Sequence, residues 1–240
     1  MGGPILKVAS WNAHALFMYS FGDKARGNHK FRALRQLVHD HDVIFVQETH
    51  GEMGDLLTLL REFPQCLSVA TFGPSAGVGG VAIILKRKLL LGAGAAPHQI
   101  ISEGRCISVV LNTAKGTLTL VNIHIDPNLK DSQKISLVHD VHNHAEEISS
   151  NLDPNLPHVV LVGGDFNSES KGNSRMDFIN NKEVEKHEPE AEVFFDKFVE
   201  YVEISQPNYT RVSIIAEKPV SAAEVASRNA LALFMYSFGD

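Results

Sequence analysis

The hydrophobic pattern of the first 65 residues alternates between two periods. Residues 5–11 and 43–46 are short, β-rich apolar runs, which are typical of buried strands. Each run precedes a stretch in which apolar residues recur at helical spacing, residues 28–40 and 56–63. Pro64 ends the second stretch. The pattern therefore predicts two strand–helix units in succession.

The pattern then changes, because four strand-like runs follow with no helix between them. Gly-containing turns separate these runs, which favours antiparallel pairing of residues 67–71, 81–86, 106–112 and 117–125. A helix capped by Asp131 or Ser132 comes next, and a strand at 158–162 runs into Gly163-Gly164-Asp165-Phe166-Asn167. This order predicts an α+β fold, a four-layer α/β/β/α sandwich of two packed mixed sheets with outer helices.

The end of the chain nearly repeats its beginning. Residues 8–23 and 225–240 agree at fourteen of sixteen positions and differ only at Trp11/Arg228 and His14/Leu231. Duplication of a coding segment is the simplest interpretation. Ser221-Ala222-Ala223-Glu224 is a capping-box pattern, and the residues that follow are rich in Ala and Leu. We therefore predict that the first copy begins as a strand and that the second begins as a helix, within a C-terminal segment that is helical.

Composition narrows the class of protein. With 240 residues, of which 44% are hydrophobic, the chain can bury one sizeable core. It has no apolar run of membrane-spanning length, and Met1-Gly2-Gly3-Pro4 is unlike a signal peptide. Cys66 and Cys106 are too few for a disulfide framework. These features predict a soluble, intracellular protein and leave its oligomeric state open.

Charge is concentrated in one segment. The net charge is −6, and residues 183–203 account for all of it, with eight acidic and two basic residues. We interpret this stretch as a solvated loop and helix. The region from Lys24 to Arg35 is locally basic. The acidic total therefore does not count against a nucleic-acid partner, and the basic region favours one.

Polar side chains that suit a metal or a phosphate stand at the ends of predicted strands. Asn12 and Glu48 each follow a strand, and Asp165 and Asn167 follow another. His124 lies near the end of a fourth strand. Strand ends can converge on one edge of a sheet, and oxygen ligands suit Mg²⁺. Since Mg²⁺ sites usually combine one or two carboxylates with substrate phosphate, the set points to phosphoryl chemistry, with Mn²⁺ as an alternative ion.

Five short motifs occur in a fixed order. They are Ser10-Trp11-Asn12, Val46-Gln47-Glu48-Thr49, Gly104-Arg105, Asn122-Ile123-His124 and Gly164-Asp165-Phe166-Asn167. As an ordered set over residues 5–211, they resemble the endonuclease/exonuclease/phosphatase superfamily, which contains pancreatic deoxyribonuclease and the apurinic endonucleases. Gln206-Pro207 and Tyr209-Thr210-Arg211 resemble a segment of its retroelement-type endonucleases, which implies a retroelement origin.

The resemblance implies a role for each matching residue. Glu48 would hold the metal with Asn12 beside it, and Asp165 would position or activate the attacking water. Asn167 would fix the phosphate, Arg105 would approach it, and His124 would stabilise charge on the transferring phosphoryl group. The implied reaction is in-line hydrolysis of a phosphodiester, with DNA as the expected substrate, in which positioning and electrostatics supply most of the acceleration.

Structural roles are the alternative for each residue. Asn12 and Asn167 could cap turns, Glu48 could be a solvent residue at a strand end, and His124 could be a packed sheet histidine. Asn128, two residues after Asp126 in a Pro-containing turn, either binds substrate, as we predict, or builds the turn.

Two further motifs are interpreted as structural. Gly77-Val78-Gly79-Gly80 precedes a strand, so a turn is favoured over a phosphate loop. His139, His142 and His144 are interpreted as a solvated helix face and not as a metal cluster.

One part of the family pattern is missing. The superfamily ends in a Ser-Asp-His motif, whereas the only histidine after Asn167 is His187, in the acidic stretch. Residues 1–211 are therefore predicted to form a C-terminally truncated domain with an open sheet edge, and residues 212–240 an atypical helical segment. Loss of a positioned acid–base group should slow hydrolysis by about 10²–10⁴-fold.

Three functions follow from these observations. The first is a Mg²⁺-dependent phosphodiesterase that acts on nucleic acid. The second is a catalytically inactive fragment of such a domain. The third keeps the fold and changes the substrate, to an inositol phosphate or a phospholipid, because substrate choice in this fold lies in loops.

Overall fold

The computed structural model describes residues 6–17, 24–90, 96–113, 116–153 and 158–167, and four strand segments at 175–177, 182–184, 210–212 and 231–238. Predictions that concern residues 185–209 and 213–230 lie outside this description, including the solvated acidic stretch and the capping box. Within the described residues, no helix is both long and apolar enough to cross a membrane.

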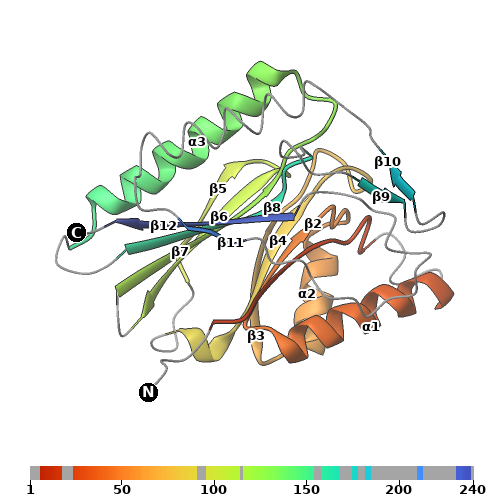
Figure 1. The fold of residues 1–240 in the computed structure, drawn as a ribbon. Helices are drawn as coiled ribbons and strands as arrows, with labels where there is room; N and C mark the ends of the chain where they lie inside the picture. Colours follow the sequence, from red (N-terminus) through yellow and green to blue (C-terminus); the bar gives the residue numbers. More distant parts are fainter. Residues whose placement is uncertain are drawn as a thin grey trace.

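The first sheet has four strands and carries the first two helices. Its order is β1 (Val8–Asn12), β2 (Val43–Gln47), β4 (Val81–Lys86) and β3 (Cys66–Thr71). β1 and β2 are parallel, because α1 (Lys24–Asp40) connects them, and the other pairs are antiparallel. α1 and α2 (Met53–Glu62) cover the outer face through buried residues that include Leu34, Val38, Leu56 and Leu59 (Figure 1).

The second sheet has six strands in the order β11 (Thr210–Val212), β12 (Leu231–Phe238), β8 (His158–Asp165), β7 (Gly116–His124), β6 (Cys106–Thr113) and β5 (His98–Ser102). β7 and β8 are parallel and joined by α3 (Asp131–Ser150), which lies along the outer face of this sheet (Figure 1). A separate antiparallel pair is formed by β9 (Arg175–Asp177) and β10 (Lys182–Val184), and η1 (Arg87–Leu89) follows β4.

The two sheets pack against each other through their inner faces. Val43, Phe45 and Ile83 of the first sheet share one buried cluster with Ile107 and Leu120 of the second. Burial on this scale supplies the main favourable term in folding. The α+β sandwich with helices on both outer faces is confirmed, because α1 and α2 cover one sheet and α3 covers the other.

The hydrophobic pattern of the sequence predicted every strand of the two sheets up to β8, with the exception of β5. In β5, His98, Gln99 and Ile100 are all exposed, so this strand lacks the alternation of buried and exposed residues that marks a half-buried strand. β5 lies at the sheet edge, and its register with β6 shifts between Ile100 and Ser102. An edge strand that pairs on one side through its backbone leaves little trace in the hydrophobic pattern.

The repeated segment behaves differently from the prediction. The first copy begins as a strand, as expected, in β1. The predicted helix in the second copy is wrong over residues 231–238, which form β12. β12 pairs antiparallel with the whole of β8, from Leu231 opposite Asp165 to Phe238 opposite His158. Pairing with a strand edge overrides helix propensity, so the edge of β8 expected to be open is occupied by a strand.

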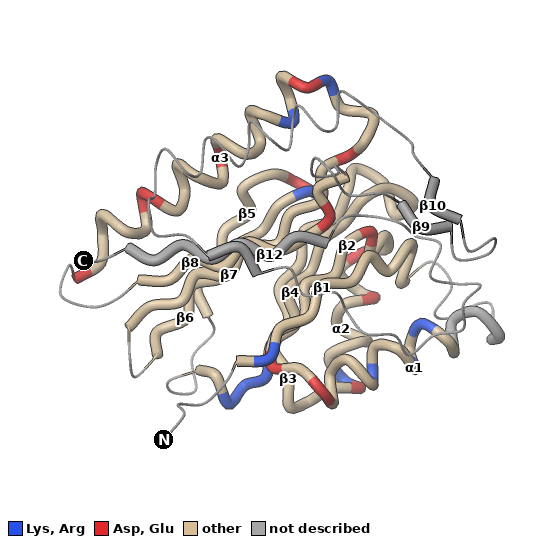
Figure 2. The backbone as a smooth tube through the Cα atoms, in the orientation of Figure 1, with Lys and Arg blue, Asp and Glu red and all other residues tan. Residues whose placement is uncertain are grey.

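Asp42 directly precedes β2, so it lies at the opposite end of the first sheet from the carboxyl ends of β1 and β2. Lys and Arg residues gather near the start of β3, at that end of the sheet (Figure 2). The Asp42 side chain is 11% exposed and accepts from Lys88 Nζ at 2.7 Å and from the Lys7 backbone N–H at 3.1 Å. Although burial alone would raise the pKa of Asp42, the Lys88 and Lys7 hydrogen bonds and the charges of Lys88 and Lys86 lower it. The folded protein therefore favours the ionised carboxylate.

Asp42→Asn should reduce the free energy of unfolding at pH 7 by about 1–3 kcal/mol. Because the pKa of Asp42 is lower in the folded protein than in the unfolded chain, its carboxylate stabilises the fold fully above the unfolded pKa of about 3.9, and this stabilisation is lost as the pH falls through the folded pKa. Urea denaturation of both proteins between pH 7 and pH 3 measures the contribution of the carboxylate. The difference between the two proteins should shrink below about pH 4. Exposed Asp140→Asn is the control, and an equal effect there would contradict the prediction.

Candidate functional site

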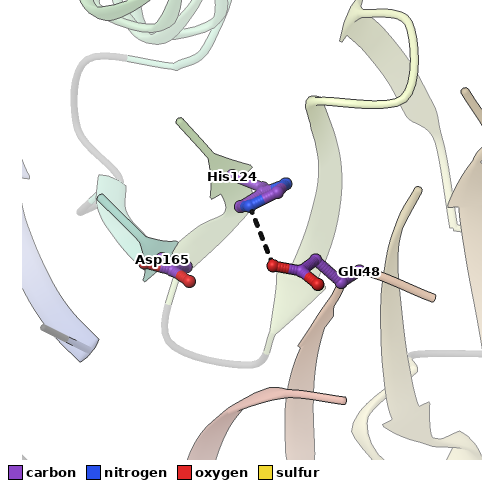
Figure 3. Close-up of side chains that lie close together, drawn as sticks. All are labelled: Glu48, His124 and Asp165. Atoms are coloured by element: carbon purple, nitrogen blue, oxygen red, sulfur yellow. Dashed lines mark ion pairs between the residues drawn. The ribbon is translucent and has the colours of Figure 1, made fainter. Parts of the chain in front are cut away.

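Four strand ends meet at one end of the sandwich. Asn12 is the last residue of β1, Glu48 directly follows β2, His124 ends β7 and Asp165 ends β8. The register places Asn12 opposite Gln47, and His124 opposite Asp165. Ligand atoms of Glu48, His124 and Asp165 all lie within 4.8 Å of one another (Figure 3). The convergence expected from the strand ends is therefore present.

Asn12 joins the two acidic residues. Its Nδ2 donates to Glu48 Oε1 at 2.9 Å and to Asp165 Oδ2 at 2.8 Å. Its Oδ1 accepts the backbone N–H of His14 at 3.0 Å. One amide thus links a carboxylate of the first sheet to a carboxylate of the second and also caps a turn.

The backbone around the site is unusual. Among the described residues, the non-glycine positions with positive φ are His14, Ala15, Glu48, His50 and Asn167, and all of them lie at or next to this cluster. Such conformations cost free energy and persist only where surrounding contacts fix them. Ala15 N–H donates to Glu48 O at 2.7 Å, and Lys30 Nζ donates to the carbonyls of His14 and Ala15. Backbone strain is therefore concentrated where the carboxylate is presented.

Glu48 is held in its ionised form. Partial burial alone would raise its pKa, but hydrogen bonds from Asn12 and His14, with the charges of His124 and His14, lower it. His14 Nδ1 lies 3.0 Å from Glu48 Oε2, although its own side chain is 79% exposed. Sequence reasoning missed His14. The available signal was that it is one of the two positions at which the repeated segments differ.

His124 is buried with one unsatisfied nitrogen. Burial lowers its pKa to about 4, so the ring is neutral near pH 7. Its Nε2 lies 3.6 Å from Glu48 Oε1, the approach drawn in Figure 3, and has no hydrogen-bond partner. Its Nδ1 lies 3.2 Å from Arg105 NH1, while Arg105 NH2 is 2.6 Å from Asp126 Oδ2. A buried ring nitrogen without a hydrogen-bond partner thus faces Glu48 at the site.

The remaining predicted residues surround this core of the site. Asn167 donates its backbone N–H to Asp165 Oδ1 at 3.0 Å and its Nδ2 to Ile125 O at 2.7 Å. Asn128 is exposed, and both its backbone N–H and its Nδ2 donate to Asp126 Oδ1. The contacts of Asn128 are therefore those of a turn residue, next to the ion pair of Asp126 with Arg105.

A buried amide pair supports the site from below. Gln47 Nε2 donates to Asn122 Oδ1 at 2.7 Å, and Asn122 Nδ2 donates to the carbonyls of Val46 and Ala82 at 2.9 and 2.8 Å. Gln47 directly precedes Glu48, and Asn122 lies two residues before His124. These bonds fix the two sheets relative to each other beneath the carboxylates.

The sequence model of the Endonuclease/Exonuclease/phosphatase family matches residues 9–195. The chain belongs to this family. The match includes Asn12, Glu48, His124, Asp165 and Asn167, so the cluster described above lies within the family domain. No sequence among the curated proteins matches the chain significantly.

Solved structures share the fold of this Endonuclease/Exonuclease/phosphatase family member. The AP endonuclease LMAP from Leishmania major is similar with a TM-score of 0.64 and 13% identity, over 96% of this chain and 79% of that one. An AP endonuclease from Archaeoglobus fulgidus gives 0.52 and 17%, over 97% and 87%. Humanized D. rerio TDP2 gives 0.54 and 16%, over 97% and 82%.

In this family member the glycine motif is a turn, as its position before β4 suggested. Thr49 N–H donates to Gly80 O, and Gly80 N–H donates to Gly104 O. Gly80 has a φ of +90°, and a Cβ there would lie 2.3 Å from Thr49 Oγ1. The glycine thus allows the loop to pack directly against the backbone that follows Glu48.

The interpretation of the helical histidines as a solvated face holds for His139, which is exposed, and needs correction for the other two. The His142 side chain is only 13% exposed, and its Nε2 lies 3.1 Å from Glu146 Oε1 one turn away on α3. His144 is not solvated. It is buried, and its Nε2 lies 2.6 Å from Ser108 Oγ, so α3 directs it into the sheet below. Its position three residues after Val141, on the apolar face, was the signal for burial.

Proposed function

We propose that this protein is a Mg²⁺-dependent phosphodiesterase that hydrolyses the backbone of nucleic acid, with DNA as its expected substrate. The observation that carries the proposal is the arrangement of Glu48 and Asp165, two carboxylates bridged by the Asn12 amide and faced by the unpartnered Nε2 of His124. Family membership and the likeness to nuclease folds support this class of reaction.

The site suits a hard cation. Glu48 and Asp165 offer carboxylate oxygens, the ligand type that Mg²⁺ prefers, with Mn²⁺ as a substitute. Glu48 would hold the ion with Asn12 beside it. Bound there, the ion would neutralise charge on a substrate phosphate.

The protein side chains would divide the remaining work. Asp165 is oriented by Asn12 and by the backbone of Asn167, so it would position the attacking water and accept its proton. Asn167 would fix the phosphate, and His124 would donate a hydrogen bond to a phosphate oxygen. Because these groups are held before substrate arrives, positioning and electrostatic stabilisation would supply most of the acceleration.

Nucleic acid is the proposed substrate for two reasons. Solved structures with the same fold include two AP endonucleases, and α1 carries the basic residues Lys30, Arg32 and Arg35, of which Lys30 donates to the carbonyls of His14 and Ala15 beside the site. We further propose a retroelement origin, and slower turnover than in relatives that have a Ser-Asp-His motif, because the sequence contains none. The expected deficit is about 10²–10⁴-fold.

Incubation with supercoiled plasmid and with an abasic duplex tests the proposal. We expect the DNA to be nicked slowly, in a reaction that requires Mg²⁺ and stops when EDTA is added. We also expect the protein to bind to immobilised DNA, with an affinity that falls as the salt concentration rises. Sphingomyelin and inositol phosphates are the parallel substrates. Turnover of these alone would instead indicate a phosphatase or phospholipase. If the protein unfolds cooperatively yet hydrolyses no phosphoester at high concentration, the domain is catalytically inactive.

A further inference from the structure

The surroundings of His124 constrain both of its ring nitrogens. The residue is 4% exposed, and the ring lies between Arg105 on the Nδ1 side and Glu48 on the Nε2 side. A neutral imidazole carries its hydrogen on one nitrogen and a lone pair on the other. Which nitrogen carries the hydrogen decides whether His124 can donate to an anion or bind a metal at Nε2.

Arg105 decides this choice by its chemistry. A guanidinium group has only N–H donors and no acceptor. The 3.2 Å contact of Arg105 NH1 with His124 Nδ1 is therefore a hydrogen bond in which Nδ1 accepts. The hydrogen of the neutral ring must then be on Nε2. Glu48 Oε1, at 3.6 Å from Nε2, is too distant to fix the tautomer through a hydrogen bond of its own.

Arg105 is itself held in place. Its NH2 donates to Asp126 Oδ2 at 2.6 Å, a short charge-assisted contact. Asp126 is fixed in turn by the backbone N–H and Nδ2 of Asn128, at 2.9 and 3.1 Å. The backbone of Arg105 also joins His124, whose N–H donates to Arg105 O at 2.8 Å. Arg105 thus belongs to a rigid chain of contacts that runs from the Asp126 turn to the His124 ring.

We propose that Arg105 is a positioning residue that fixes His124 in the Nε2–H tautomer. In this form Nε2 presents a hydrogen, and no lone pair, to the space beside Glu48 and Asp165. His124 then serves as a donor to an anionic oxygen and is excluded from the metal ligands. The tautomer does not depend on the proposed function, whereas the use of the donor by a phosphate rests on it.

The consequence is selectivity among cations. Without a nitrogen ligand from His124, the carboxylate oxygens of Glu48 and Asp165 are the ligand atoms of this cluster. Such a set favours a hard ion over Zn²⁺, which binds imidazole nitrogen well. Arg105, sequestered by Asp126 and His124, therefore acts on the site through the ring and not by reaching toward phosphate.

The test is nitrogen NMR of metal-free protein labelled with ¹⁵N-histidine, in which shifts and couplings assign the hydrogen-bearing nitrogen of His124. We expect the Nε2–H tautomer in the wild type. In Arg105→Met, which lacks the donor, that single tautomer should be lost. Arg105→Lys, which keeps a charged donor, should restore it. Arg87→Met is the matched control, since it removes an exposed arginine whose Nε donates to the carbonyl of Pro64.

Each outcome decides the proposal. An Nδ1–H tautomer in the wild type, or an unchanged Nε2–H signal in Arg105→Met, would overturn it. If Arg105→Met does not fold, Asp126→Asn provides a second test, because it weakens the contact that holds the same guanidinium group. The Nδ1 signal of His124 should then broaden or shift, and an unchanged Nδ1 signal in Asp126→Asn would also overturn the proposal. Where nicking is measurable, Arg105→Met should lower kcat by about 10²-fold, and Arg87→Met should not. Loss of all activity with the expected tautomers would count against the proposed function alone.

Discussion

Glu48→Gln is expected to abolish Mg²⁺-dependent nicking, with a loss of at least about 10³-fold in rate. Glutamine fills nearly the same volume, so the backbone and the packing around β2 should persist. The substitution removes the negative charge of the carboxylate. Partial burial alone would raise the pKa of Glu48, but hydrogen bonds from Asn12 and His14 lower it, so the folded protein favours the charged form.

The geometry of the site sharpens this expectation. Oε1 of Glu48 accepts from Asn12 Nδ2, and Oε2 lies 3.0 Å from His14 Nδ1. An amide has one oxygen, so its NH₂ group must face one of these two neighbours. Glu48→Gln therefore removes the charge and also disturbs either the Asn12 bridge to Asp165 or the contact with His14.

Glu62→Gln is the matched control, because it makes the same carboxylate-to-amide change at an exposed position at the end of α2. Nicking of supercoiled plasmid and Mn²⁺ binding followed by electron paramagnetic resonance are the two measurements. Glu48→Gln should lose both, and Glu62→Gln neither. Nicking that survives in Glu48→Gln at a rate near the wild type would place the metal site elsewhere.

The parts of this site that could be predicted from sequence are those that depend on strand direction. Asn12, Glu48, His124 and Asp165 each end a run with clear strand character, and the ends of neighbouring strands must lie together. Their residue types then indicate metal and phosphate chemistry. The hydrophobic pattern therefore contains enough information to place Asn12 beside Glu48 and His124 beside Asp165, whereas the meeting of the two pairs depends on how the two sheets pack.

The parts that could not be predicted depend on tertiary contacts. His14 reaches Glu48 because His14 and Ala15 adopt left-handed conformations. These conformations are maintained by the hydrogen bond from Ala15 N–H to Glu48 O and by the bonds from Lys30 Nζ to the carbonyls of His14 and Ala15. Nothing in the local sequence requires a positive φ there. The engagement of Arg105 by Asp126 was equally hidden, because the two residues lie 21 positions apart and meet only when β6 and β7 pair.

The repeated segment shows the same limit most directly. Residues 15–17 and 232–234 have the same sequence, Ala-Leu-Phe. In the first copy these residues form a turn, with Leu16 and Phe17 buried beside α1 and α2. In the second copy they lie in β12, paired with β8. One sequence thus adopts two conformations in a single chain, because the surrounding surfaces differ.

Asn122→Ala is expected to reduce the free energy of unfolding by about 3–5 kcal/mol, the largest stability effect that we predict. The side chain is fully buried between the sheets and makes three hydrogen bonds, two to the carbonyls of Val46 and Ala82 and one from Gln47. Alanine removes all three and leaves a cavity. Gln47 is also left with a buried Nε2 whose remaining partner is Ser10 Oγ at 3.2 Å.

Urea denaturation of Asn122→Ala and of Asn112→Ala measures this contribution, since Asn112 is exposed on the neighbouring strand β6. Asn112→Ala should change stability by no more than about 0.5 kcal/mol. Because Gln47 and Asn122 act as a pair, Gln47→Leu combined with Asn122→Leu should cost less than the sum of the two single changes. Equal losses in the Asn122 and Asn112 variants would mean that apolar packing alone holds the sheets together. A large loss confined to Asn122→Ala would mean that the buried amides fix the sheets beneath Glu48 and His124.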